Sequence, residues 1–304
     1  MQKGVKFRIY PNKEQQTIIN QTLGCCRLIY NKGLAMRNEA YQNGNKIGYS
    51  QTSAMLIDLK KSDDFAFLKA VDSIALQQSL RDLDRGFVNF FQKRASHPTF
   101  KSKQNHHQSY RTINQSNNIR IVGKYIKLPK LGYVKVRQSM EVGKINNVTI
   151  ERTPTNKYFA VLNVKFEPQP MSNKGGKIGI DVGIKEFYSD SNGNVVYNPK
   201  YLEKSMRKLI REQRKLSRKE KGSTNRNKQR VKVALVHEKI TNQRNDFLQK
   251  QSTMLIRENQ TICIEDLKVK NMMRLFVWEQ LFEVVQAIMI MCVVRYQKEL
   301  LKSV

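Results

Sequence analysis

The sequence predicts a multidomain α+β protein, on three observations. In the first part apolar residues recur at helical spacing, in the middle part they alternate with polar ones, and in the last part apolar strands carrying carboxylates are separated by basic helices. Helical spacing marks a helix with one buried face, and alternation marks a half-buried strand. A chain of 304 residues with 39% apolar residues has room for two or three such modules.

The first part, 11–93, is predicted to be helical after a short initial strand. Asn12 stands at the position of a helix N-cap, and Gln-Asn-Gly-Asn at 42–45 indicates a turn. The apolar faces of two helices are predicted at Ile18, Ile19, Leu23, Cys26 and Tyr30, and at Ile74, Leu76, Leu80, Leu83, Phe87, Phe90 and Phe91. Each set falls mostly three or four residues apart, which is typical of a helix packed on one side.

The middle part changes to a period of two. A polar, basic loop that includes His106 and His107 is predicted at 97–109, and short strands follow from 120 to 166. Glycine and proline breaks between the strands indicate hairpins, and several short strands at this spacing indicate a small barrel. Tyr110 and Tyr125 could stack on nucleic-acid bases, although packing within the barrel is the better expectation for each.

The last part begins with an apolar strand that carries Asp181 and continues as a three-stranded meander. Two basic helices are predicted next, one at 202–219 and a longer one that follows it. A second buried strand then ends at Glu265, and a terminal helix is predicted at 275–301. Strands that alternate with helices in this way indicate an α/β domain.

The charge of the chain indicates a polyanionic partner. Lys and Arg outnumber Asp and Glu by 55 to 25, which gives a formal charge of +30. Such a chain repels itself unless a polyanion compensates it, so a long nucleic acid is predicted. The range 204–244 holds 15 Lys and Arg but 3 acids, whereas a solvated helix surface usually mixes both signs. RNA phosphates are therefore predicted to bind Arg207, Lys208, Arg211, Arg214, Lys215 and Arg218.

Other sequence features argue against a secreted or membrane protein. The N-terminus lacks the pattern of a secretory signal, and the apolar stretch at 284–294 is about half a membrane span. A cytoplasmic protein without a membrane partner is expected. The four cysteines include no Cys-x-x-Cys pattern, so neither a disulfide framework nor a zinc site is predicted. They are expected to be reduced packing residues.

Asp181 and Glu265 are the candidate metal-binding carboxylates. A strand with a carboxylate, then a hairpin, helices and a later strand ending in a carboxylate is how a ribonuclease-H-like fold begins, and that fold brings both acids to one edge of the sheet. Two Mg²⁺ ions about 4 Å apart need several carboxylates, because one ion activates the water and the other the leaving oxygen. The plain alternatives are a turn acid for Asp181 and a helix-capping acid for Glu265.

The motifs Lys177-Ile-Gly-Ile-Asp-Val-Gly-Ile and Ile264-Glu-Asp-Leu-Lys resemble the TnpB family. These proteins are RNA-guided DNA nucleases of bacterial insertion sequences and are related to type V CRISPR effectors. Further landmarks are found at 5–11, 27–31, 76–91, 98–101 and 126–132, so the resemblance extends over about 1–283.

The resemblance implies a helical recognition lobe inserted in a β-barrel wedge domain, followed by a truncated RuvC-like, ribonuclease-H-like α/β domain. The expected bounds are 1–10 for the first strand of the wedge barrel, 11–96 for the lobe, 97–168 for the barrel, 169–176 for a linker and 177–304 for the RuvC-like domain. The implied partners are a structured guide RNA and double-stranded target DNA that forms an RNA–DNA heteroduplex. A short DNA motif beside the target would be read at Tyr49, Ser53, Gln77, Thr112 and Asn114.

The sequence departs from the family pattern after Glu265. Family members continue past a helix beginning near Trp278 with a strand, a four-cysteine zinc ribbon and a third catalytic Asp, whereas no Asp follows Asp266 here. We therefore expect no zinc, no tightly held Mg²⁺, and a nuclease-inactive protein in which Asp181 and Glu265 are remnants.

Binding does not require cleavage in RNA-guided recognition, because base pairing reads the target and cutting is a later step. The predicted function is therefore an RNA-guided DNA-binding protein that represses transcription at the nucleoid, in the bacterial cytoplasm. The alternatives are an active RNA-guided DNA endonuclease of an insertion sequence and a decayed transposon fragment.

Overall fold

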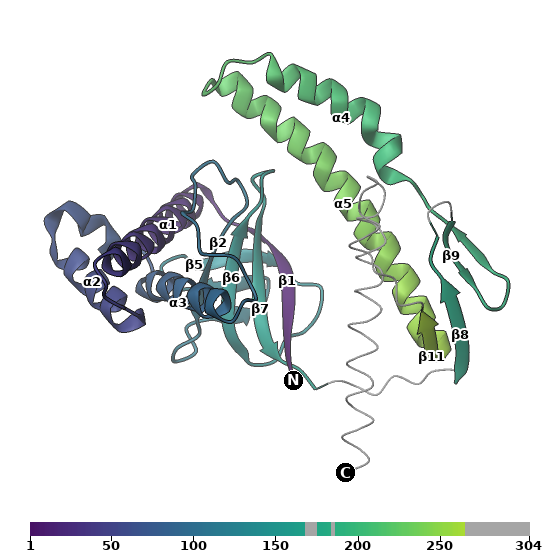
Figure 1. Cartoon of the computed structure of the whole chain (residues 1–304), viewed down its shortest axis with the longest axis horizontal. Helices are drawn as coiled ribbons and strands as arrows, with labels where there is room; N and C mark the ends of the chain where they lie inside the picture. Colours follow the sequence, from purple (N-terminus) through teal and green to yellow (C-terminus); the bar gives the residue numbers. More distant parts are fainter. Residues whose placement is uncertain (168–174, 184–185, 265–304) are drawn as a thin grey trace, which may run out of the picture. The chain divides into compact units, whose positions relative to one another are not determined.

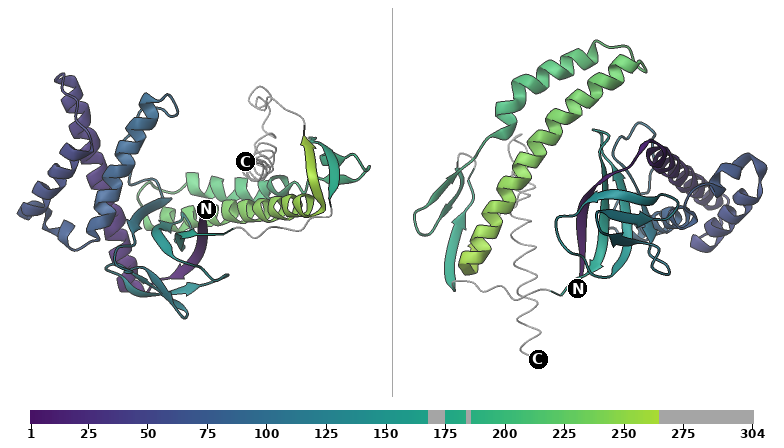
Figure 2. Two further views of the ribbon diagram at one scale, coloured as in Figure 1. Left: turned by 90° about the horizontal axis from the view of Figure 1, so that it is seen from below. Right: turned by 180° about the vertical axis from the view of Figure 1, so that it is seen from behind.

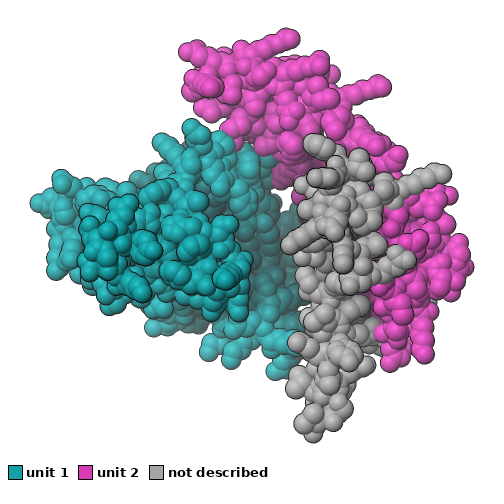
Figure 3. Space-filling model, viewed as in Figure 1, with its two compact units in different colours: residues 1–168 teal, residues 169–304 magenta. Residues whose placement is uncertain are grey.

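The computed structural model describes residues 1–167, 175–183 and 186–264. The chain divides into two compact units, Met1–Pro168 and Gln169–Val304, which are coloured separately in Figure 3. Both units combine helices with a sheet, so the predicted α+β class is confirmed. The wedge and RuvC-like domain names stay predictions. In the described part of the chain, no helix is both long and apolar enough to span a bilayer.

The first unit contains a curled seven-stranded sheet in the order β2-β6-β7-β1-β5-β4-β3 (Figure 1). Its strands are β1 (Gln2–Tyr10), β2 (Gln108–Ile113), β3 (Arg120–Val122), β4 (Tyr125–Leu128), β5 (Gly132–Arg137), β6 (Ile145–Arg152) and β7 (Tyr158–Lys165). The N-terminal strand β1 lies between β7 and β5 and pairs antiparallel with both. The first ten residues therefore complete a sheet whose other strands lie more than ninety residues later in the chain.

The helical region lies between β1 and β2 in the sequence. It consists of α1 (Lys13–Gln42), α2 (Tyr49–Lys61), the 3₁₀ segment η1 (Asp63–Lys69) and α3 (Ser73–Phe91). Asn12 caps α1 as predicted, since its side chain accepts a hydrogen bond from the backbone N–H of Gln15 at 2.8 Å. The predicted turn is also confirmed: α1 ends at Gln42, and Gly44 takes a φ of 77°.

The sheet and the helices of the first unit share one hydrophobic core. Phe7 and Ile9 of β1 and Val134 of β5 are at most 1% exposed, and they cluster with Ile19 of α1 and Leu76 of α3. Since successive strand residues point to opposite faces, the other face of the sheet carries the residues between these positions. Both views in Figure 2 show α1, α2 and α3 gathered on one side of this sheet.

Gly33 sets how closely α1 and α3 approach. A Cβ at Gly33 would lie 2.8 Å from Leu80 Cδ2 and 3.1 Å from Leu83 Cδ2, whereas a Cβ at Gly24 of the same helix would meet nothing within 4 Å. We expect Gly33→Val to lower the free energy of unfolding by about 1–3 kcal/mol through overpacking. Gly24→Ala should instead raise it by about 1 kcal/mol through helix propensity. Urea denaturation of both variants checks the pair, and equal effects would contradict this account.

The described residues of the second unit form a four-stranded sheet in the order β10-β9-β8-β11 and two helices. The elements are β8 (Gly176–Asp181), β9 (Glu186–Asp190), β10 (Val195–Tyr197), α4 (Tyr201–Ser217), α5 (Thr224–Glu258) and β11 (Asn259–Ile264). The meander β8–β9–β10 and both basic helices are confirmed. The strand β11 pairs parallel with β8, and Ile264 lies opposite Ile180.

Some expectations differ from the structure or lie outside it. The strand β2 occupies a stretch where the sequence predicts a loop and the segment that follows it. The prediction missed this strand because its inward residues are Tyr110 and the polar Thr112. Cys25 and Cys26 are buried as expected, but Cys263 is exposed, so its expected packing role is wrong. Glu265, most of the predicted linker and the terminal helix lie outside the described residues.

Candidate nucleic-acid interface

The two basic helices form an antiparallel hairpin, visible at the top of Figure 1. Leu209 of α4 packs with Val236 and Ile240 of α5, and all three are at most 7% exposed. Nearer the sheet, the ring of Tyr201 meets the ring of Phe247 at 6.4 Å between centroids. A narrow apolar seam therefore joins the helices and leaves most of each helix surface to solvent.

A buried, hydrogen-bonded pair, Glu212 of α4 and Gln229 of α5, lies beyond the apolar seam and is here called the polar lock. Gln229 Nε2 of α5 donates to the carbonyl of Glu212 at 3.1 Å and to its carboxylate at 2.7 Å, and both side chains are buried. Hydrogen bonds hold the pKa of the Glu212 carboxyl below its ordinary value, and the bond from Gln229 has a larger effect than the bond from Lys215. Arg226 donates to the carbonyls of Leu216 and Lys219 at 2.8 and 2.7 Å, which closes the end of α4.

The six predicted RNA-binding residues all lie on α4 or at its C-cap, and all six are exposed. Arg207, Arg211, Arg214 and Arg218 recur at intervals of three and four, so they share one face of the helix. Arg211 and Lys215 also approach the Glu212 carboxylate at 3.5 and 3.4 Å. The arrangement offers a continuous row of cations, which suits a backbone of regularly spaced phosphates. Their contact with RNA stays a prediction.

Asp181 ends β8 at a hollow of about 500 Å³ on the sheet. The hollow is also lined by Gly179, Ser189, Asp190, Ser191 and Cys263. Asp181 is exposed, and Ile264 is the last described residue of the neighbouring parallel strand. Glu265 follows Ile264 in the sequence, but it lies outside the described residues, so the predicted meeting of the two carboxylates stays a prediction.

Asp190, the second carboxylate of this hollow, is used by its own turn. Its Oδ1 accepts from the backbone N–H groups of Asn192 and Asn194, and its Oδ2 accepts from the Asn194 side chain, each at 2.9 Å. Among the described residues, Asp181 is therefore the carboxylate that this hollow offers to a cation. Since two-ion chemistry needs several carboxylates, the described residues do not by themselves make a two-ion site.

Asp190 is predicted to make the stability of the fold depend on pH. The Asn194 side chain, together with two backbone N–H groups, lowers the pKa of the Asp190 carboxyl. A lowered pKa in the folded state stabilises the fold above the unfolded value of about 3.9, and this stabilisation is lost as the pH falls through the folded value. The stability gap between wild type and Asp190→Ala should therefore be constant near pH 7 and shrink below about pH 4. Urea denaturation across pH measures it, and Asp58→Ala, at an exposed residue, is the control.

Three of the predicted DNA-motif residues come together on the helical region. Tyr49 and Ser53 lie one turn apart on α2, and both are half-buried. Gln77 is exposed on α3, one turn before Arg81, whose guanidinium lies 4.6 Å from the ring centre of Tyr49. Arg81 therefore links the two helices at this surface. The sequence prediction missed it, because the contact depends on how α2 packs against α3.

The side chains of the other two predicted DNA-motif residues are buried or hydrogen-bonded within the fold. Thr112 is 1% exposed within β2, so its hydroxyl is not presented to solvent. The Asn114 amide donates to the carbonyls of Ile119 and Ile145 at 3.0 and 2.9 Å, and its Oδ1 accepts from the N–H of Ile119 at 2.9 Å. Asn114 thus joins the end of β2 to the neighbouring segments. Thr112 is buried and Asn114 already makes three hydrogen bonds within the fold, and a role of either residue in reading DNA stays a prediction.

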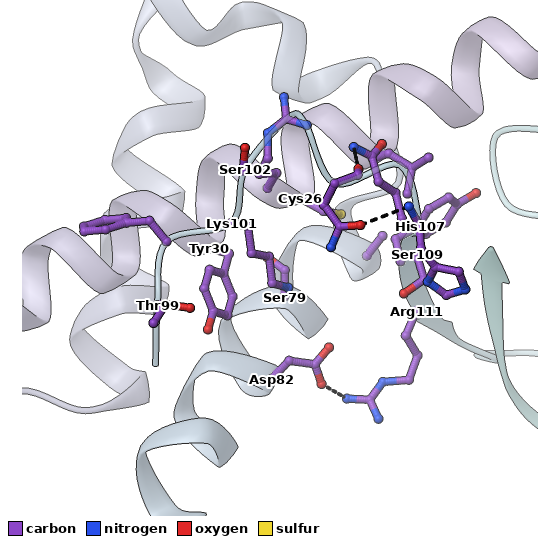
Figure 4. Close-up of a pocket in the computed structure, with 17 residues that line it drawn as sticks. Cys26, Tyr30, Ser79, Asp82, Thr99, Lys101, Ser102, His107, Ser109 and Arg111 are labelled. Atoms are coloured by element: carbon purple, nitrogen blue, oxygen red, sulfur yellow. Dashed lines mark hydrogen bonds and ion pairs between the residues drawn. The ribbon is translucent and has the colours of Figure 1, made fainter. Parts of the chain in front are cut away.

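A cavity of about 480 Å³ lies where α1, α3, β2 and the loop after Pro98 meet (Figure 4). Asn31 holds the backbone of Lys101 with two hydrogen bonds of 3.0 and 2.8 Å, and the Lys101 Nζ lies 4.0 Å from the ring centre of Tyr30. Burial lowers the pKa of Lys101, and Asp82 opposes the shift. Asp82 itself forms an ion pair with Arg111. These contacts hold the loop against the helices.

Within the described chain, no cluster of metal-ligating side chains involves His106 or His107.

Comparison with known families places the chain among insertion-sequence proteins. The family model OrfB_IS605, described as "Probable transposase", matches residues 150–275. The model HTH_OrfB_IS605, described as "Helix-turn-helix domain", matches residues 1–46. In this structure the second range forms the strand β1 and a single helix, α1, followed by a turn.

Two known proteins resemble most of the chain. A "Putative RNA-guided DNA endonuclease" of Streptomyces pristinaespiralis is 38% identical over 278 residues, which cover 90% of this chain and 69% of that protein. The "Putative RNA-guided DNA endonuclease InsQ" of Escherichia coli K12 is 35% identical over 274 residues, which cover 88% of this chain and 66% of that protein. The chain thus spans about two thirds of the length of these relatives.

The matches define an IS605-type insertion-sequence protein. The chain belongs to the TnpB family. A solved CRISPR-Cas12f ternary complex also matches 91% of this chain and 70% of the solved one, with 13% identity. Its TM-score of 0.36 is too low for the likeness to carry an argument.

Proposed function

We propose that the chain is an RNA-guided DNA-binding protein. The observation that carries the proposal is the row of exposed cations on α4, in a member of a family whose relatives are named RNA-guided DNA endonucleases. In this proposal the α4–α5 hairpin holds the phosphates of a structured guide RNA, which is the cofactor. The guide then pairs with one strand of double-stranded DNA, and the resulting heteroduplex specifies the sequence.

The surface formed by Tyr49, Ser53, Gln77 and Arg81 is the proposed reader of the short DNA motif beside the target. Gln and Arg side chains can make bidentate hydrogen bonds to adenine and guanine edges in the major groove. Because Arg81 stacks on Tyr49, its guanidinium is held in a defined orientation before DNA arrives. Thr112 and Asn114 are left out of this proposed surface, because the fold buries the first and uses the second.

The finer proposal is binding without cutting, which would block transcription at the guided site on the bacterial chromosome. Its support is the hollow at Asp181, where the other described carboxylate is used by its own turn. We propose accordingly that the protein needs no zinc and holds Mg²⁺ weakly. The second candidate is guided cleavage through Asp181 and Glu265, which the names of the relatives favour.

One experiment separates these candidates. The chain is purified from its host, its RNA is sequenced, and the complex is incubated with guide-matched and scrambled DNA in the presence of Mg²⁺. Tight binding of matched DNA without cuts supports the finer proposal. Matched cuts that disappear in Asp181→Asn establish the endonuclease. Absence of a discrete RNA species would overturn guided binding itself and revive the decayed fragment.

A further inference from the structure

The outer face of the seven-stranded sheet carries tyrosines and cations. In β5, Val134 and Val136 are buried, whereas Tyr133, Lys135 and Arg137 between and beside them are exposed. This is the face opposite the one that shares a core with the helices. The residues that point outward from β1, β4 and β5 are here called the sheet platform, and they include Arg8, Tyr10, Tyr125, Lys127, Tyr133, Lys135 and Arg137.

The strand registers place each tyrosine of the platform beside a cation. Lys135 lies directly opposite Tyr125 on one neighbouring strand and opposite Tyr10 on the other. In the next row, Tyr133 lies opposite Lys127. Because neighbouring strands are about 4.8 Å apart, the two tyrosines of the first row are roughly 10 Å apart with the lysine between them. Tyrosine side chains thus alternate with cations across three strands.

The platform also contains two arginines on adjacent strands. Arg8 of β1 lies directly opposite Arg137 of β5. The Arg8 guanidinium lies over the rings of Tyr10 and Phe159, at 5.5 and 5.0 Å from their centres. Guanidinium groups beside aromatic rings are suited to a ligand with both negative charge and flat rings.

The plain alternative is that the tyrosines stabilise the sheet through cross-strand packing. Tyr10 and Tyr125 are 47% exposed and Tyr133 is 51% exposed, which leaves about half of each side chain in contact with solvent. Among the described residues, the ring pairs do not involve any of these three tyrosines. Cross-strand packing therefore explains only the covered half of each ring.

We propose that the sheet platform is a second nucleic-acid site, which binds unpaired bases by stacking them on Tyr125, Tyr133 and Tyr10. The cations between the tyrosines bind the phosphates that link those bases. Stacking on aromatic side chains tolerates any base, so the site recognises single strands rather than a sequence. Two strands have this chemistry: an unpaired segment of the guide RNA and a DNA strand displaced from the target. That choice of sources rests on the proposed function.

The test uses the full chain and two fluorescein-labelled single strands, one of RNA and one of DNA. Both have the same sequence of 20 nucleotides, which does not pair with itself and is about the length of a guided heteroduplex. An RNA duplex of the same length is the third probe. We expect the double variant Tyr125→Ala/Tyr133→Ala to weaken binding of at least one single strand by about 10- to 100-fold, as measured by fluorescence anisotropy. Binding of the duplex should change less than threefold, on the order of a surface substitution.

Two control variants are needed to interpret the result. Tyr125→Phe/Tyr133→Phe keeps the rings and should keep the affinity. Tyr41→Ala/Tyr197→Ala removes two tyrosines that are 75% and 71% exposed outside the platform, and should have no effect. The strand that depends on the platform tyrosines identifies the source. Unchanged affinity of the alanine variant for both single strands, or equal losses in the control variant, would overturn the platform.

This test and the test of the proposed function can fail separately. The probes require neither a guide nor a matched target, so the platform can be present in a chain that binds no guide RNA. Conversely, guided DNA binding that persists in the alanine variant, with single-strand binding also unchanged, would overturn the platform and leave the proposed function standing. A circular dichroism melt of each variant checks that loss of binding is not loss of fold.

Discussion

Reversing three charges on α4 is expected to abolish most RNA affinity. Arg207→Glu/Arg214→Glu/Arg218→Glu changes three exposed residues of one helix face. Each substitution removes a cation from a phosphate and adds a repulsion, so we expect the affinity for the co-purifying RNA to fall on the order of 100-fold at 0.15 M salt. The slope of log affinity against log salt should also fall, by about 0.7 for each phosphate that is no longer neutralised. Filter binding across a salt series measures both quantities.

The control for this variant has the same change in net charge elsewhere. Lys13, Lys61 and Lys69 are exposed residues of the first unit, and their triple reversal to Glu should reduce the affinity far less. Equal losses in both variants would mean that overall charge, and not the α4 row, governs binding. Full affinity with an unchanged salt slope would likewise contradict the row as the main phosphate site.

Leu255→Ala is expected to have the largest effect on the second unit. Leu255 of α5 is 2% exposed and packs in the same small cluster as Ile178, Ile180 and Phe187. Its truncation should lower the free energy of unfolding of this unit by about 2–5 kcal/mol, because it removes buried apolar contacts and leaves a cavity in this cluster. Hydrogen exchange of the full chain measures the effect, since β8 and β11 should lose protection while β1 and β7 keep it.

Met254 provides the control for Leu255. It precedes Leu255 on α5 and is 39% exposed, so Met254→Ala should change the free energy of unfolding by less than about 0.5 kcal/mol. If Leu255→Ala also removes protection from the core around Phe7, the two units unfold together, and the description of two separate cores is wrong for their stability.

The sequence predicts those elements whose pattern is set locally. The strand β5 is found as expected, because Val134 and Val136 alternate with exposed residues. Both helices of the hairpin are found because their apolar residues recur at helical spacing. The strand β2 is missed for the opposite reason. Its inward residues are Tyr110 and Thr112, and a threonine becomes a core residue only through strands that are distant in the sequence.

The candidate sites show the same division. The basic row on α4 can be read directly, because charge and helical spacing are both local properties. Arg81 over Tyr49 cannot be read in this way, since the contact depends on how α2 packs against α3. The polar lock between Glu212 and Gln229 depends on the register of two helices across a turn. The role expected for Thr112 ignored its burial, which follows from pairing with β6.

The parallel pairing of β8 with β11 has a consequence for the order of folding. Ile180 meets Ile264 across 264 − 180 = 84 residues, and both helices of the hairpin lie within that interval. Such distant pairing forms slowly, because the chain must close a long loop before the strand pairing offsets the entropy cost of closure. The α4–α5 hairpin shortens the flexible part of this loop once its helices pack through Leu209, Val236 and Ile240. The strand pair that carries Asp181 is therefore expected to form after the hairpin.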